Sequence, residues 1–250
     1  MWVQRGGPPD KPVVIFDYDP SRSQTVPARL LEGFAGYLQC DGYEGYSAVG
    51  RHDDVVLVGC WAHARRKFDE ALKAMGKKAT SKASHAKTGI DRIRELYRIE
   101  TEAKDLTPDA RHQVRQERAV PLLKAMRQWL DQSLTEVPPQ SATGKALGYL
   151  HGQWQKLTRY VEDGRIPIDN NAAERAIRPF VIGRNNWLFS DTTKGAETSA
   201  RLYSLVATAK VCGHEPYRYL SHVIKALPAT DSVDGFEALL PFNVDPARLD

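Results

Sequence analysis

The sequence has few cysteines and no long apolar run. Its 250 residues include three cysteines, Cys40, Cys60 and Cys212, which are far apart in the chain. An odd, scattered set of this kind argues against a disulfide scaffold and fits a reducing compartment. No apolar run approaches the roughly 20 residues that span a bilayer, and Met1 is not followed by a signal-peptide pattern. We therefore expect a soluble cytoplasmic protein with no membrane partner.

A strong charge of either sign is also absent. Lys and Arg together number 35, against 31 Asp and Glu, which gives a formal net charge of +4. This modest basic bias permits a phosphate-bearing partner without requiring one. The chain is long enough to bury a sizeable core in one large or two small domains, and no internal repeat is visible in it.

Apolar, β-branched segments in the first 60 residues predict strands. Residues 1–5 and 12–18 have the pattern of a hairpin, joined by a turn rich in Gly and Pro. Residues 37–40 and 55–60 predict two further strands, and a helix is expected to begin at Trp61.

From about residue 69 to residue 160 the pattern is helical. Apolar side chains recur near helical spacing in most of this stretch. Residues 73–87 differ, because they are polar and Lys-rich, and they predict an exposed linker or a frayed helix. The sequence therefore predicts an all-helical block between two α/β segments.

The residues around Glu174 predict the start of a helix. Glu174 and Arg178 would lie one turn apart on one face of it, with Arg175 beside them and Arg184 nearby. The plain interpretation is an i,i+4 salt bridge of Glu174 with Arg178; the alternative is an acid held among arginines for a function. Candidate N-caps are Asp169, Asn170 and Asn171.

Two more helices are predicted beyond this one. Residues 185–189 predict a short extended or turn element, residues 196–211 an amphipathic helix, and residues 216–227 another helix. The core-facing side chains of the amphipathic helix are expected to be Leu202, Leu205, Val206 and Ala209.

Asp41 follows directly after a predicted buried strand. Carboxylates at the carboxyl ends of central strands are where open α/β sheets bind their ligands. Taken alone, however, an Asp before Gly42 is typical of a turn or cap. Both interpretations stay open from the residues themselves.

Cys60 and His63 have the C-x-x-H spacing of zinc ligands. A tetrahedral zinc site needs a second pair, and the candidates are Cys212 and His214, whose spacing is atypical. Packing or local hydrogen bonding by Cys60 and His63 is therefore the favoured interpretation.

Four motifs occur in order along the chain. They are GYLQCDGYEGY (36–46), CWAHARRKF (60–68), IDNNAAER (168–175) and GRNNWLF (183–189), and the predicted helix at 203–213 continues them. Each motif is weak alone. In this order and at these separations, the chain resembles transposases of the insertion-sequence-66 family over essentially its whole length.

The resemblance implies a DDE transposase with an α/β, ribonuclease-H-like fold. Such a fold has a mixed sheet, here with a large α-helical insertion and a C-terminal helical segment. The implied division is 1–68 for the first part of the catalytic core, 69–160 for the insertion, 161–212 for the core helices with the third acid, and 213–250 for the tail.

The resemblance also implies the site residues. By position, Asp41 is the second and Glu174 the third of three acids that hold two Mg²⁺ or Mn²⁺ ions. Two metals suit in-line displacement at phosphorus, because they activate the attacking oxygen and neutralise the leaving one; Mg²⁺ prefers such hard oxygen ligands. Cys60 and His63 match a C-x-x-H signature whose role is expected to be structural.

DNA, as transposon ends and as target, is the implied partner. Arginine suits phosphate, and the arginines expected to hold the DNA backbone are Arg65, Arg66, Arg175, Arg178 and Arg184. The full-length family also implies a homo-oligomer and accessory transposition proteins.

The chain departs from the family pattern at its N-terminus. The family's first acid lies upstream of the strand that contains Trp2, so this acid and the N-terminal DNA-binding segments are expected to be missing. Asp17 and Asp19 end a strand and are possible substitutes, although motif alignment puts them on the third strand and Asp17 is expected to belong to a turn. We therefore expect a transposase fragment for DNA cleavage and strand transfer that is inactive alone. The alternatives are an active enzyme using Asp17 or Asp19, an inactive DNA-binding remnant, and an unrelated helical interaction protein.

Overall fold

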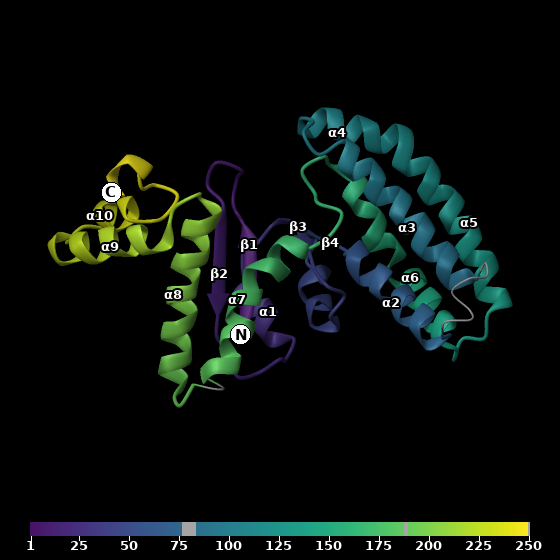
Figure 1. Cartoon of the computed structure of the whole chain (residues 1–250), viewed down its shortest axis with the longest axis horizontal. Helices are drawn as coiled ribbons and strands as arrows, with labels where there is room; N and C mark the ends of the chain where they lie inside the picture. The colour runs from purple at the N-terminus through teal and green to yellow at the C-terminus, as the bar shows by residue number, and fades with distance from the viewer. Residues whose placement is uncertain (77–83, 188–189, 250) are drawn as a thin grey trace. The chain divides into compact units, whose positions relative to one another are not determined.

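The computed structural model describes residues 1–76, 84–187 and 190–249, and within α7 the side chains of residues 184, 185 and 187 lie outside that description. The described residues form a mixed α/β protein that is mostly helical, with two two-stranded sheets (Figure 1). The chain divides into two compact units. We call Met1–Arg22 with Asn171–Asp250 the terminal unit, and Ser23–Asn170 the central unit. No helix in the described ranges is long and apolar enough to cross a membrane.

Most of the predicted elements are present. The strands are β1 (Trp2–Gly6), β2 (Val13–Asp17), β3 (Gly36–Gln39) and β4 (Val55–Val58). The helices are α1 (Thr25–Leu30), α2 (Trp61–Ala74), α3 (His85–Glu102), α4 (Pro108–Val114), α5 (Val120–Glu136), α6 (Ala142–Thr158), α7 (Asn171–Trp187), α8 (Thr193–Val211), α9 (Pro216–Ala226) and α10 (Val233–Ala238).

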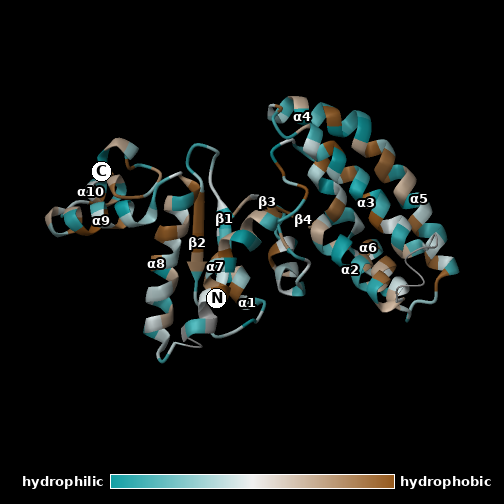
Figure 2. Cartoon of the chain, viewed as in Figure 1, coloured by the Kyte–Doolittle hydropathy of each residue, from teal (hydrophilic) through white to brown (hydrophobic). Residues whose placement is uncertain are grey.

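The terminal unit is built on the predicted hairpin, which the structure confirms. β1 and β2 pair antiparallel, with Val3 opposite Phe16 and Arg5 opposite Val14. β2 is mostly hydrophobic (Figure 2), and its buried Val14 and Phe16 form a core with Ala200 of α8. Helix α7 packs against β1, and α8 packs against β2.

Helix α8 holds the outer edge of β2 through hydroxyl groups. The backbone N–H of Val14 donates to Oγ1 of Thr208 at 3.1 Å, and the same hydroxyl donates to the Val14 carbonyl at 3.0 Å. The N–H of Phe16 donates to Oγ of Ser204 at 2.8 Å. Four helical residues rise about 6 Å and two strand residues about 6.7 Å, so one hydroxyl per turn meets every second strand residue.

The predicted core face of this helix was therefore partly wrong. Leu202 is 51% exposed, whereas Thr208 is buried against β2. Leu205 and Ala209 do face a core, but it is the small C-terminal cluster with Tyr219 of α9. A hydrophobic pattern misses this arrangement because a hydroxyl that bonds a strand edge can be buried without leaving polar groups unpaired.

A second expectation was also wrong. The extended or turn element predicted at residues 185–189 is helical as far as Trp187, because α7 runs on to that residue. Residues 188 and 189 lie outside the described ranges. In the polar stretch predicted at 73–87, α2 ends at Ala74 and α3 begins at His85.

The central unit combines the parallel pair β3–β4 with the predicted helical block. Gly36 pairs with Val55 and Gln39 with Val58. Helices α2, α3, α5 and α6 bury one large core that includes Trp61 and Phe68. Arg115, in the π-helical turn between α4 and α5, is 1% exposed and forms an ion pair at 2.6 Å with Glu100 of α3.

We expect Thr208→Val to destabilise the protein by about 2–4 kcal/mol, because it leaves the buried N–H and C=O of Val14 unpaired. Thr198→Val on the same helix is the matched control, since the exposed Thr198 hydroxyl donates to the Lys194 carbonyl of its own helix; its effect should stay within about 0.5 kcal/mol. Urea unfolding measures both. Equal losses would contradict the role given to Thr208.

We expect Arg115→Leu to cost about 3–5 kcal/mol, because it leaves the Glu100 carboxylate largely buried without its cation. Arg118→Leu is the control: Arg118 pairs with Glu102 at 2.6 Å, but both side chains are exposed, so the loss should be about 0–1 kcal/mol. Urea midpoints of the two variants give the comparison. A similar midpoint for both would count against a buried ion pair as the anchor of this turn.

Candidate active site and nucleic-acid interface

Asp41 lies where the two parallel strands end. β3 and β4 run in the same direction, so their carboxyl ends meet at one edge, and Asp41 and Cys60 each lie two residues beyond their strand. The Asp41 side chain is exposed, and one carboxylate oxygen accepts the backbone N–H of Tyr43 at 3.0 Å. Gly42 makes this turn possible with a φ of +81°. Asp41 therefore forms a turn and also displays a carboxylate at the strand edge.

Two tyrosines lie close to Asp41. Burial raises the pKa of Tyr46 to about 12, and the charge of Asp41 adds to this rise. Burial also raises the pKa of Tyr149 to about 12, with smaller contributions from Cys60 and Asp41. The Tyr149 hydroxyl donates to the Asp41 carbonyl at 3.5 Å. The Tyr149 hydrogen bond links the loop after β3 to α6, and Tyr46 packs against the small core that contains Cys40.

Cys60 fastens the segment that leads into α7. Its sulfur accepts the backbone N–H of Asn170 at 3.4 Å, and the N–H of Trp61 donates to the Ile168 carbonyl at 3.2 Å. Burial raises the pKa of the Cys60 thiol. Among the residues that the structure describes, no three His, Cys, Asp or Glu side chains are grouped so as to hold a metal ion.

Asp169, in the same segment, is held by α3. The Tyr97 hydroxyl donates to Oδ2 of Asp169 at 2.7 Å. Burial and this hydrogen bond together raise the pKa of Tyr97 above its usual value. The segment before α7 is thus held by α3 through the Asp169 carboxylate, and by Cys60 and Trp61 through its backbone.

Glu174 lies in the first turn of α7. A carboxylate is favourable there because the amino end of a helix carries partial positive charge. The helix packs on the hairpin through Ala176, Ile177 and Phe180. Arg178 is exposed and forms no ion pair with any described residue, so the i,i+4 bridge with Glu174 is not made.

The predicted site residues fall in both units. Asp41, Cys60, His63, Arg65 and Arg66 belong to the central unit, whereas Glu174, Arg175, Arg178 and Arg184 belong to the terminal unit. Arg65 and Arg66 are exposed on α2, and Arg65 pairs with Asp69 at 3.8 Å. The side chain of Arg184 lies outside the part that the structure describes.

The two candidate substitutes for the first acid lie at the end of the hairpin. Asp17 is the last residue of β2, opposite Trp2, and is not part of a turn. Asp19 accepts the backbone N–H of Ser21 at 2.8 Å and so forms a local turn. Both belong to the terminal unit.

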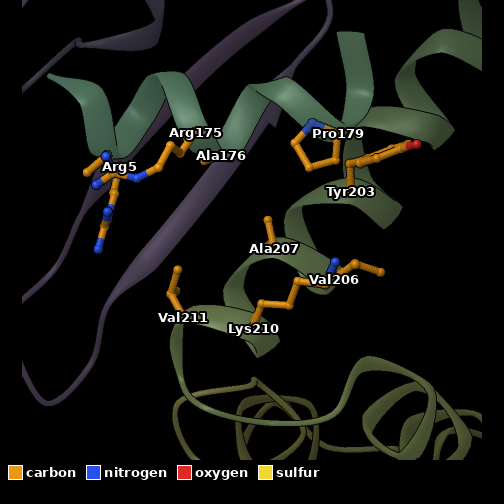
Figure 3. A pocket seen from close by; sticks show the side chains of 10 residues that line it. Arg5, Arg175, Ala176, Pro179, Tyr203, Val206, Ala207, Lys210 and Val211 are labelled. Carbon is orange, nitrogen blue, oxygen red and sulfur yellow. The ribbon is translucent and has the colours of Figure 1, made fainter. Parts of the chain in front are cut away.

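Sequence reasoning missed a pocket in the terminal unit. It lies between α7 and α8 beside β1 and has a volume of about 260 Å³ (Figure 3). Arg5, Arg175 and Lys210 line it together with small and apolar side chains. The spacing of Ala172, Arg175, Ala176 and Pro179 along one helix face could have indicated the α7 wall, but no local pattern links Arg5 or Lys210 to it. The apolar part of the lining comprises Ala172, Ala176, Pro179, Tyr203, Val206, Ala207 and Val211.

Comparisons with known proteins point to one family. The family model described as "Transposase IS66 family" matches residues 1–198, and the model "IS66 C-terminal element" matches residues 204–242. The uncharacterised protein y4qI of Sinorhizobium fredii (strain NBRC 101917 / NGR234) is 33% identical over 94% of this chain and 44% of its own length. The uncharacterised protein y4jD of the same strain is 32% identical over 94% and 46%. The chain thus spans less than half the length of these relatives, and no solved structure matches it.

We expect Tyr97→Phe to cost about 1–2 kcal/mol at pH 8, because Asp169 loses its hydroxyl donor. The raised pKa of Tyr97 adds stability that is fully present below about pH 10 and is lost as the pH rises through the folded-state pKa. The difference between wild type and variant should therefore shrink above pH 10. Urea unfolding at pH 8 and pH 10.5 measures this difference in the free energy of unfolding.

Tyr37→Phe is the control, because it removes an exposed hydrogen bond to Glu162. Its free energy of unfolding at pH 8 should stay close to that of the wild type. A loss as large as that of Tyr97→Phe would argue against a special role for Asp169.

Proposed function

This chain belongs to the IS66 family of transposases, and we propose that it takes part in metal-dependent cleavage and joining of DNA strands. The observation that carries the proposal is the match of the family models to residues 1–198 and 204–242. Because the chain covers less than half of its relatives' length, the activity of the whole protein is part of the proposal.

We also propose a ribonuclease-H-like arrangement for the strands. Two features support it. An antiparallel hairpin, β1–β2, is followed along the chain by a parallel pair, β3–β4. The helical block α2 to α6 then separates the end of β4 from α7, where Glu174 lies. This order agrees with a catalytic core interrupted by an insertion.

Asp41 and Glu174 are the proposed metal ligands. Each offers carboxylate oxygen, the ligand type that Mg²⁺ and Mn²⁺ prefer. Among the described residues, the turn at Asp41 engages one of its two oxygens in a backbone hydrogen bond, and the carboxylate stays exposed at the strand edge. When bound, the ions would supply Lewis-acid activation of the attacking oxygen and neutralisation of the leaving one.

The arginines are proposed to position the DNA. Arg65 and Arg66 lie exposed on α2, and Arg175 and Arg178 lie exposed on α7. Their guanidinium groups can form bidentate hydrogen bonds with phosphate oxygens, which orient the DNA backbone without reading the base sequence. Binding of this kind weakens as salt rises, because each phosphate contact releases a counterion.

Titration calorimetry with Mn²⁺ tests the carboxylates. We expect Asp41→Asn and Glu174→Gln each to remove Mn²⁺ binding, because each takes away a charged ligand, while binding of a duplex measured by fluorescence anisotropy persists. Asp53→Asn and Glu197→Gln are matched controls at exposed positions of the central and terminal units, and both should bind Mn²⁺ like the wild type.

The outcomes separate the catalytic proposal from its alternative. Mn²⁺ binding that is the same in all four variants, or absent from the wild type, would contradict the metal role of Asp41 and Glu174. Duplex binding that persists in that case would favour a DNA-binding protein without catalysis. A chain that binds no DNA would overturn both.

A further inference from the structure

The pocket in the terminal unit exists because its walls are lined by short side chains. Helix α7 packs against β1 and α8 packs against β2. Where the two helices face each other, Ala172, Ala176 and Ala207 leave the space between them unfilled. The ring of Tyr203 forms part of the wall and is held in place by Phe180, with ring centroids 5.1 Å apart.

Three cations from three elements surround this apolar space. Arg5 comes from β1, Arg175 from α7 and Lys210 from α8 (Figure 3). All three are exposed, and within the described ranges none of them forms an ion pair. Among the residues that the structure describes, no acidic side chain lines the pocket. Like charges gathered at a low-dielectric cavity raise the local concentration of anions, so the expected ligand joins an apolar body to negative charge.

We propose that this pocket binds one unstacked nucleotide of single-stranded DNA, with its base in the apolar part and its flanking phosphates on Arg5, Arg175 and Lys210. The inference rests on the proposed function, because it takes DNA as the partner. A base inside a duplex is stacked and cannot enter such a pocket, so the ligand is a strand end or an unpaired base. The volume of about 260 Å³ lies just below the range of about 300–1,000 Å³ typical of small-molecule sites, which suits one base rather than a longer ligand.

The pocket lies beside the proposed metal-binding residue Glu174, because Arg175 of its lining is the next residue of α7. Arg175 follows Glu174 directly in the first part of α7. A strand whose phosphate is held by Arg175 is therefore bound at the same helical turn as the proposed metal-binding carboxylate. The pocket would distinguish an opened or frayed DNA end from intact duplex at that point.

Fluorescence anisotropy with three DNAs tests the proposal. They are a single-stranded 12-mer, a fully abasic 12-mer with the same phosphates, and a blunt duplex of the same sequence. We expect Ala207→Phe, which fills the pocket, to weaken binding of the 12-mer about tenfold and to leave the abasic strand unchanged. Lys210→Gln and Arg5→Gln should weaken both single strands, because both have phosphates.

Matched controls separate loss of the pocket from a general loss of charge or fold, including the case in which the large side chain at position 207 disturbs packing. Lys225→Gln and Arg218→Gln remove exposed cations of α9 that do not line the pocket, so their affinity for the 12-mer should match the wild type. Far-UV circular dichroism of each variant checks the fold. Lys210→Gln, at an exposed position, stays informative even if Ala207→Phe does not fold.

Several results would overturn the pocket proposal. Equal binding of the 12-mer and the abasic strand by the wild type would show that no base is held. Equal losses for Lys210→Gln and Lys225→Gln would show that the pocket is not used. A mononucleotide, dAMP, that binds as tightly as the 12-mer would make it a free-nucleotide site instead. In each case duplex binding and Mn²⁺ binding still test the transposase proposal separately, whereas a chain that binds none of the three DNAs would contradict both.

Discussion

The hydrogen bonds from Thr208 and Ser204 to the outer edge of β2 are the interaction on which the terminal unit depends. A strand edge offers donors and acceptors alternately, and a hydroxyl can serve as both. Helix α8 therefore takes the place of a further strand beside β2, which also closes an edge that would otherwise invite pairing with another chain. This register also fixes where the other faces of α8 point. Tyr203 and Lys210 line the pocket, and Ala209 packs in the C-terminal cluster.

The central unit depends in a similar way on the chain just after β4. The N–H of Gly59 donates to the Lys156 carbonyl at 2.9 Å, and Nε1 of Trp61 donates to the Leu157 carbonyl at 2.8 Å. These bonds join the strand end to α6, while Cys60 holds Asn170. The helical block is therefore more than an appended insertion. It supports the edge where Asp41 is displayed, because Tyr149 of α6 bonds the Asp41 backbone.

The elements with strong local patterns were predictable from the sequence. The hairpin and the strand before Asp41 are confirmed as β1–β2 and β3, because apolar alternation and Gly-rich turns are local signals. The extended or turn element predicted at residues 185–189 was wrong at residues 185–187, since α7 continues to Trp187 with Pro179 inside it. The core face predicted for α8 was wrong at Leu202, because the hydrophobic pattern assigns no buried role to hydroxyl side chains.

By itself, the sequence determined the chemical groups and most of the helices and strands, since both follow from residue type and short-range spacing. It also determined the family, through motifs kept in order along the chain. Only the tertiary structure decided that Ser204 and Thr208 are the buried side of α8, and that Arg5, Arg175 and Lys210 share one pocket. The physical reason is that these relations join residues about 30 to 200 positions apart, and they depend on how a strand edge satisfies its hydrogen bonds and on where short side chains leave space.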